Sequence, residues 1–138
     1  MKRIGAVLIS HGSLANELLE ATRTVYGDIA HITAVSLGWH DDVSDAEARI
    51  ERAIREVSDG AGVLLLTDMF GGTPTNIAAM FLKDGETEVL TGMNLPMVVK
   101  VASQNREVDL GTFAEEVEQQ GKKSIYRAGD LLVPKAGK

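Results

Sequence analysis

Residues 4–11, IGAVLISH, form an almost continuous apolar run that ends in a histidine. A run without regular polar alternation is typical of a strand that is buried on both faces. The next residues, GSLANELL at 12–19, have leucines at helical spacing, and Ser13 is expected to cap that helix. A buried strand, a short polar turn and a helix in this order predict an α/β fold. They place His11 at the carboxyl end of the first strand.

The alternation of strand and helix continues along the chain. A capping box, Ser44 with Glu47, is expected to start the second helix, and Thr73 with Pro74 the third. Further strands are predicted at 31–37, 63–67 and 87–91, a short fifth one, SIYRA, at 124–128, and helices at 46–57, 73–82, 96–104 and 112–120. The pattern predicts a doubly wound, mainly parallel sheet, of strand order about 2-1-3-4, with helices on both faces. Residues 1–133 are expected to form one domain and residues 134–138 a frayed tail.

Composition limits the classes of function. The chain has 138 residues, 44% of them hydrophobic, which suits one domain with a core. A formal net charge of -6 disfavours nucleic acid and anionic membranes as partners, and the absence of cysteine excludes disulfides and thiolate chemistry. The apolar N-terminal run is too short for a signal peptide or a membrane span. A soluble cytoplasmic protein is therefore expected.

Ligands of open parallel sheets bind beyond the carboxyl ends of the strands, where the strand order reverses. His11 follows the first predicted strand and Asp68 the third. Neighbouring strands lie about 4.8 Å apart, so the two side chains are expected within hydrogen-bonding reach. A carboxylate on one imidazole nitrogen fixes the tautomer and leaves the other nitrogen free as a nucleophile or ligand.

The same two turns are rich in groups that suit an anion. "GGTP" places Gly71, Gly72 and Thr73 at the start of a helix, and Gly12 with Ser13 does the same at the first helix. Unpaired N–H groups at a helix start favour a phosphoryl group. Each feature alone has an ordinary explanation as a turn or a cap. Their coincidence at the expected switch point favours a functional site.

At these residues the sequence resembles the mannose-type enzyme IIA domain of the phosphoenolpyruvate-dependent sugar phosphotransferase system. The resemblance rests on "ISHG", "DMFGGTPTN" and "GMNLPM", in this order, and covers residues 2–133. It implies that His11 accepts phosphate on Nε2, that Asp68 orients its ring, and that Thr73 is the hydroxyl residue after the glycine pair. It also implies HPr as donor, a IIB domain on a separate chain as acceptor, a homodimer, and an antiparallel edge strand, for which 124–128 is the candidate.

Some residues have open interpretations. Trp39 and His40 depart from the family pattern, and they either line the rim of the site or cover the edge of the core. Met69 and Phe70 are candidates for docking carrier proteins, with core capping as the alternative for Phe70. His31 is expected to be structural. The three histidines lie on separate elements, so no metal site or cofactor is expected.

Several functions remain open at this point. The first is a relay that passes phosphate from HPr through His11 to a IIB domain for sugar import. A regulator that signals phosphotransferase status through the same histidine is the alternative, as is the phosphoryl donor subunit of dihydroxyacetone kinase. A non-covalent binder of a phosphorylated small molecule is a different class. The identity of the sugar does not follow from the sequence.

Overall fold

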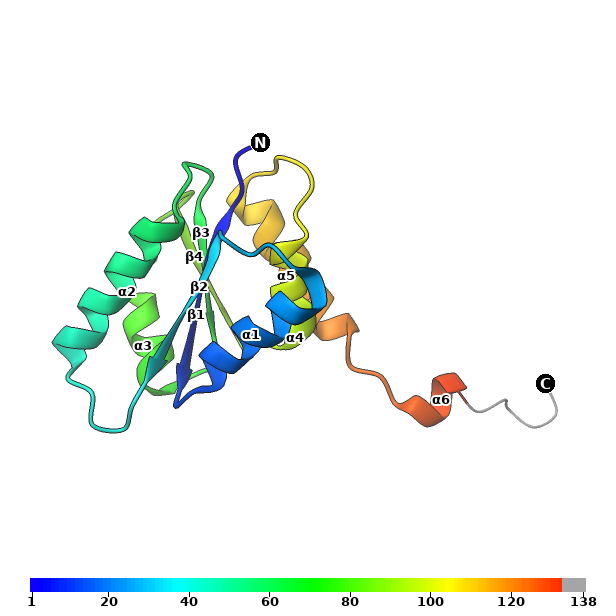
Figure 1. Ribbon diagram of the computed structural model, residues 1–138, viewed down its shortest axis with the longest axis horizontal. Coiled ribbons are helices and arrows are strands. Elements are labelled where there is room, and N and C mark those ends of the chain that lie inside the picture. Colours follow the sequence, from blue (N-terminus) through cyan, green and yellow to red (C-terminus); the bar gives the residue numbers. More distant parts are fainter. Residues whose placement is uncertain (133–138) are drawn as a thin grey trace.

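The computed structural model describes residues 1–132, in which one sheet of four parallel strands forms the centre of the molecule (Figure 1). The strands are β1 (Gly5–His11), β2 (Ile32–Leu37), β3 (Val63–Thr67) and β4 (Thr87–Thr91), and their order is β2-β1-β3-β4. The predicted α/β class and strand order are confirmed. Because parallel strands end at the same edge of the sheet, the turns after β1 and β3 are neighbours.

Helices cover both faces of this sheet (Figure 1). Helices α2 (Val43–Val57) and α3 (Gly72–Ala79) lie on one face. Helices α1 (Leu14–Tyr26), α4 (Leu95–Ala102) and α5 (Leu110–Lys123) lie on the other. A short helix, α6 (Ala128–Leu132), stands away from this body at the end of the chain.

The core has two parts, divided by the alternation of side chains along β1. Ala6 and Leu8 face α1, α4 and α5, whereas Val7 and Ile9 face α2 and α3. All four are fully buried, as the apolar run predicts. Full burial of an aliphatic side chain contributes roughly 1.5–3 kcal/mol. The strand that carries His11 is therefore held by packing on both faces.

The helix starts differ from the predicted ones. The side chain of Ser13 makes no capping bond, and the hydroxyl of Ser10 accepts a hydrogen bond from the N–H of Ala15 instead, at 2.7 Å. The capping box at Ser44 does not form, because α2 begins at Val43, with Asp42, two residues before Ser44, as its cap.

The third helix also differs, since it runs from Gly72 to Ala79 rather than from Thr73 to residue 82. Short polar residues occur close together before each of these helices, and the choice of cap among them depends on the path of the preceding loop.

The predicted fifth strand is wrong. Residues 124–127 form no strand, the segment leaves the body at the end of α5, and α6 follows. Ile125 is 80% exposed and Tyr126 67%. Apolar residues favour a strand only where a neighbouring strand pairs with them, and within residues 1–132 the segment has none. The tail predicted at 134–138 lies outside the described residues.

Candidate functional site

His11 is the last residue of β1 and lies beside the turn that follows β3. Its imidazole Nδ1 is 2.8 Å from Oδ2 of Asp68, although the two residues are 57 positions apart in the sequence. The backbone N–H of His11 donates to the same oxygen, also at 2.8 Å. One carboxylate oxygen thus holds both the backbone and the ring of His11. The strand order brings these two residues together as expected.

The pair has a defined charge and tautomer. Burial raises the pKa of Asp68, but hydrogen bonds from the backbone and ring of His11 outweigh that effect and hold the pKa below its usual value. The carboxylate is therefore ionised and accepts, so Nδ1 of His11 carries a proton. In the neutral ring Nε2 then has a free lone pair. The other carboxylate oxygen, Oδ1, is buried without a partner in the described structure.

The start of α3 faces the free side of this ring. Gly71 and Gly72 have φ angles of 82° and 84°, a region that favours glycine. A Cβ on Gly72 would lie 3.1 Å from Cε1 of His11 and 3.3 Å from Nε2. The first N–H groups of a helix have no partner within it, and here they belong to Gly72 and Thr73. Only glycine lets this backbone approach the imidazole so closely.

Buried hydroxyl groups that sequence reasoning missed hold the turn after β3 in place. Thr75 donates to the carbonyl of Met69 at 2.6 Å, so Thr67 is the donor in its 2.7 Å bond to Thr75. This chain of bonds ties the end of β3, the turn and the first turn of α3 together. The only sign of it in the sequence is that Thr67 and Thr75, eight positions apart, flank the segment DMFGGTP.

The start of α1 is less available than predicted. The N–H of Gly12 donates to the carbonyl of Leu37 at 2.8 Å. Ser13 is exposed, and the N–H of Ala15 is taken by the hydroxyl of Ser10. Ser10 is another residue that sequence reasoning missed, and it is fully buried directly before His11. Of the two helix starts near His11, that of α3 keeps more free donors.

A cleft of about 150 Å³ opens beside His11, between the β2–α2 loop and the start of α3. Trp39 forms one wall, with its ring centroid 6.2 Å from that of His11, and Thr73 and Pro74 form the other. The side chain of His11 is 36% exposed, whereas that of Asp68 is 10% exposed. The ring of His11 is accessible, whereas the carboxylate of Asp68 is sheltered. Of the two interpretations of Trp39, the structure supports the rim of the site.

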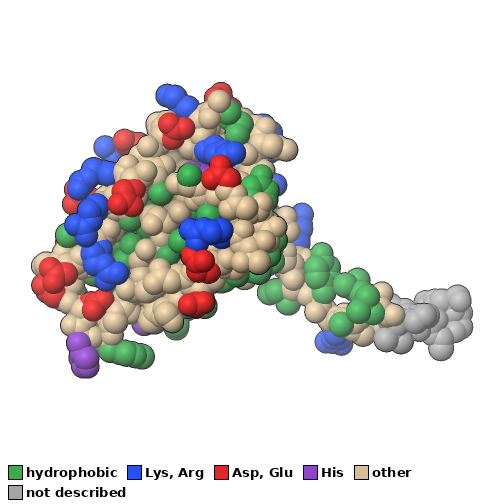
Figure 2. Space-filling view, viewed as in Figure 1, with side chains coloured by type: hydrophobic (Ala, Val, Ile, Leu, Met, Phe, Trp, Pro, Cys, Tyr) green, Lys and Arg blue, Asp and Glu red, His purple; other side chains and the backbone are tan. Residues whose placement is uncertain are grey.

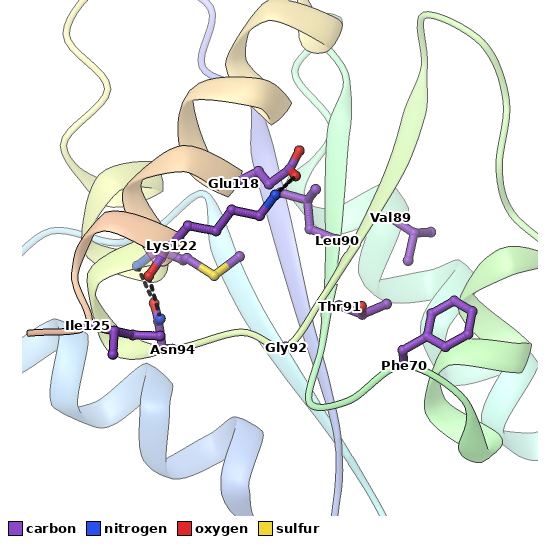
Figure 3. A pocket seen from close by; sticks show the side chains of 11 residues that line it. Phe70, Val89, Leu90, Thr91, Gly92, Asn94, Glu118, Lys122 and Ile125 are labelled. Atoms are coloured by element: carbon purple, nitrogen blue, oxygen red, sulfur yellow. Dashed lines mark hydrogen bonds and ion pairs between the residues drawn. The ribbon is translucent and has the colours of Figure 1, made fainter.

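Met69 and Phe70 lie in the turn between Asp68 and α3. They are 55% and 83% exposed, so Phe70 does not cap the core. Phe70 also borders a second cavity of about 490 Å³ between β4 and α5. Figure 3 shows Phe70 and Thr91 on one side of this cavity and Ile125 on the other. The exposed turn thus separates the His11 cleft from the second cavity.

The other polar residues considered from the sequence, His31, His40 and Asn94, make no hydrogen bond to the His11–Asp68 pair in the described structure. His31 lies before β2, at the opposite end of the sheet, where it is buried as expected. His40 is exposed in the β2–α2 loop. Asn94 caps α4 by accepting from the N–H of Met97 at 3.1 Å. Within residues 1–132, no group of three or more potential ligands is placed to hold a metal ion, and no helix is long and apolar enough to span a membrane.

Comparison with known sequences gives consistent matches. Residues 5–118 match the family model described as "PTS system fructose IIA component". The chain is 25% identical to the PTS system fructose-specific EIIA component of Bacillus subtilis, over 94% of this chain and 89% of that protein. It is 34% identical to the mannose-specific EIIAB component of Escherichia coli, over 70% of this chain but only 30% of that longer protein.

Solved structures agree with these matches. A mannose/sorbose-specific IIA subunit from Enterococcus faecalis superposes with a TM-score of 0.82, at 28% identity, over 96% of this chain and 98% of that one. A component EIIA from Streptococcus agalactiae gives a TM-score of 0.81 at 22% identity, over 92% and 98% of the two chains. The second likeness bears on the fold alone.

Proposed function

The chain belongs to the family of PTS system fructose IIA components, and from that premise we propose that it relays a phosphoryl group through His11. Family membership makes it a phosphotransferase component of the fructose, mannose and sorbose type. The observation that carries the assignment to His11 is the 2.8 Å bond between its Nδ1 and Asp68. That bond leaves Nε2 as the nucleophile, facing the start of α3.

The transfer needs no net movement of a proton. The lone pair of Nε2 attacks the phosphorus of a donor phosphohistidine, and the nitrogen–phosphorus bond of the donor breaks as the new one forms. The phosphorylated ring then has substituents on both nitrogens and carries a positive charge. The carboxylate of Asp68 balances that charge and keeps the proton on Nδ1. Reversal of the step passes the group to an acceptor.

Stabilisation of the phosphoryl oxygens is assigned to the start of α3. The free N–H groups of Gly72 and Thr73 lie at the positive end of the helix dipole. The hydroxyl of Thr73 is a further donor on the wall of the cleft. Gly71 lets the chain turn into this arrangement. Gly12 and Ser13 are assigned a smaller part, because the N–H of Gly12 is already bonded to Leu37.

The proposal is tested by labelling. The protein is incubated with enzyme I, HPr and ³²P-phosphoenolpyruvate. The wild type should acquire label that is stable in alkali and labile in acid, as expected for a phosphohistidine. His11→Ala should acquire none. His40→Ala is the matched control, since it removes an exposed imidazole from the same edge of the sheet and should label as the wild type does. Label on His11→Ala, or none on the wild type, would contradict the proposal.

The partners in this proposal are HPr as donor and a IIB domain as acceptor, both in the cytoplasm. The name of the mannose-specific relative, EIIAB, joins an A and a B component, which supports a B-type acceptor. Addition of a cognate IIB domain to the labelled protein should discharge it within the mixing time of the assay. Retention of the label with every IIB domain of the host would instead favour the regulatory alternative.

We also assign a homodimer to this protein. The segment after α5 carries Ile125 and Tyr126, and α6 carries Leu131 and Leu132, all of them at least 60% exposed. Exposed apolar residues on a projecting segment support a contact with a second chain. Sedimentation should give a dimer for the full chain and a monomer for a chain that ends at Ser124. A full-length monomer at micromolar concentration would contradict this assignment.

A further inference from the structure

Among the large apolar residues within 1–132, Trp39 is the most exposed, at 88%. It lies in the β2–α2 loop, and its ring is tilted by 41° to the ring of His11, with 6.2 Å between their centroids. An indole that covers no core and stands beside a reactive ring does not stabilise the fold by burial. Tryptophan is among the residues that contribute most to protein interfaces when a partner buries it.

The loop that carries Trp39 is held in a defined conformation. The carboxylate of Asp41 accepts from the N–H of Gly38 at 2.7 Å, which closes the loop on either side of Trp39. Arg49, on α2, donates to Asp41 at 3.3 Å and to the carbonyl of Ser36 at 3.0 Å. The guanidinium therefore fastens the loop to the end of β2. A residue held in place in advance loses less entropy when it binds.

The surface next to Trp39 combines an apolar and an acidic character. Val43 is 52% exposed. Asp42 and Asp45 are exposed at the start of α2, which follows the loop that carries Trp39. Figure 2 shows acidic side chains gathered at this end of α2, beside hydrophobic and histidine side chains that protrude from the β2–α2 loop. We name Trp39, Val43, Asp42 and Asp45 the tryptophan rim.

We propose that the tryptophan rim is the docking surface for the protein that donates the phosphoryl group, and this inference rests on the proposed function. A donor must bring its phosphohistidine to Nε2 of His11, so its surface has to cover the adjacent indole. A donor also carries a phosphoryl dianion and needs cationic groups around it. Those cations are complementary to Asp42 and Asp45. The occupant is thus a phosphohistidine protein with an apolar pocket bordered by lysine or arginine.

Binding of the donor protein and transfer of the phosphoryl group can be measured separately at this site. Trp39 does not hydrogen-bond His11, and it is not assigned a step in the transfer. Its removal is therefore expected to weaken the encounter and to leave the step at saturating donor unchanged. A purely structural part for Trp39 would lower thermal stability instead, and its 88% exposure argues against that.

The first test measures the initial rate of labelling against the concentration of phosphorylated HPr. Trp39→Ala should raise KM by about tenfold or more and change kcat by less than about twofold. Trp39→Phe should lie between this variant and the wild type. Tyr26→Ala is the matched control, because Tyr26 is a 45% exposed aromatic residue at the opposite end of the sheet. It should behave as the wild type does.

The second test addresses charge. Asp45→Asn should raise KM by about twofold to fivefold at low salt and reduce the dependence of KM on ionic strength. Glu56→Gln, which removes one exposed negative charge from the last turn of the same helix, is the control and should change neither quantity.

The outcomes separate this inference from the proposed function. If the wild type takes up label and Trp39→Ala has the same KM, the tryptophan rim is not the docking surface, while the relay through His11 stands. If Trp39→Ala loads normally and is slow only in discharge to IIB, the assignment to the donor is wrong. If the wild type acquires no label from a competent donor, the proposed function itself fails.

Discussion

His11 and His31 are two histidines at opposite ends of the same sheet, and the fold uses them in opposite ways. His31 is bonded through both nitrogens. Arg3 donates to its Nδ1 at 3.3 Å, and its Nε2 donates to the carbonyl of Val101 at 3.1 Å. His11 is bonded through Nδ1 alone, to a carboxylate. Because an arginine only donates and a carboxylate only accepts, the two neutral rings have opposite tautomers.

The comparison shows what makes an imidazole available for chemistry. Both rings stand next to a strand, and both have an ordered partner. His31 is 9% exposed, and both of its ring nitrogens are hydrogen-bonded. It is therefore a structural residue of the core edge. His11 has one nitrogen fixed and the other presented to a helix start and a cleft. The proposed reactivity of His11 depends on this nitrogen, which makes no hydrogen bond in the described structure.

Replacement of each histidine by glutamine should give the largest difference between the two sites, in phosphoryl transfer for His11 and in stability for His31. His11→Gln should lose phosphoryl transfer by more than about a thousandfold, because the nucleophile is gone, and should change stability by less than about 1 kcal/mol. His31→Gln should label normally and lose about 1–3 kcal/mol of stability, because a buried bonding group is disturbed. Labelling rates and urea melts of both variants measure this. A loss of labelling in His31→Gln with the fold intact would break the comparison.

Asp68→Asn tests the charge of the carboxylate. The amide oxygen would take the place of Oδ2, because the backbone N–H of His11 requires an acceptor there, so the tautomer is kept but the negative charge that balances the phosphorylated ring is lost. Phosphoryl transfer should fall by about a hundredfold or more, with a smaller effect on folding. Asp109→Asn is the control, since Asp109 caps α5 far from the site. Equal transfer rates for Asp68→Asn and the wild type would contradict the charge-balancing role assigned to Asp68.

The two glycines at the start of α3, the cap Gly71 and the first helical residue Gly72, test the close approach to His11. Gly72→Ala and Gly71→Ala place a Cβ on backbones of nearly equal φ, 84° and 82°, so each should cost about 1–2 kcal/mol. Only the Cβ at Gly72 meets the ring of His11, whereas that at Gly71 has open space around it. Transfer should therefore slow about tenfold more in Gly72→Ala. Equal slowing in both variants would show that only the strained backbone matters.

The smallest effect is a dependence of stability on pH. Burial lowers the pKa of His31, and Arg3 lowers it further, against the opposing effects of the bond to Val101 and of Asp28. The folded state therefore binds this proton less readily than the unfolded state does. The contribution of neutral His31 to the free energy of unfolding is complete above the pKa of the unfolded state, about 6.5. It is lost as the pH falls through the lower pKa of the folded state. Urea melts between pH 7.5 and pH 5 should show the loss, and His31→Gln should lack it.

Much of the site was predictable because it depends on topology. Apolar runs identified the four strands, and the strand order then required that His11 and Asp68 meet. No knowledge of loop conformation was needed. The position of the glycine pair at the start of α3 was predictable for the same reason, since it follows from the end of β3 and the start of the next helix.

Other features depend on contacts between distant residues and were not predictable. Asp41 and Arg49, from α2, hold the loop that carries Trp39. No local sequence pattern predicts these two hydrogen bonds. The caps of α1 and α2 depend on Ser10 and Asp42 rather than on Ser13 and Ser44. The strand predicted at 124–128 failed because strand formation needs a paired neighbour, which a local apolar pattern does not supply.

Trp39 has a practical consequence. It is the single tryptophan of the chain, and it stands 6.2 Å from the ring of His11. Phosphorylation of His11, as proposed, would place new charge close to the indole, and we therefore expect the tryptophan emission to change when the protein is loaded. Excitation at 295 nm in a stopped-flow instrument would follow the arrival and departure of the phosphoryl group in real time, without radioactivity. The same signal would be lost in His11→Gln, which gives the baseline of the measurement.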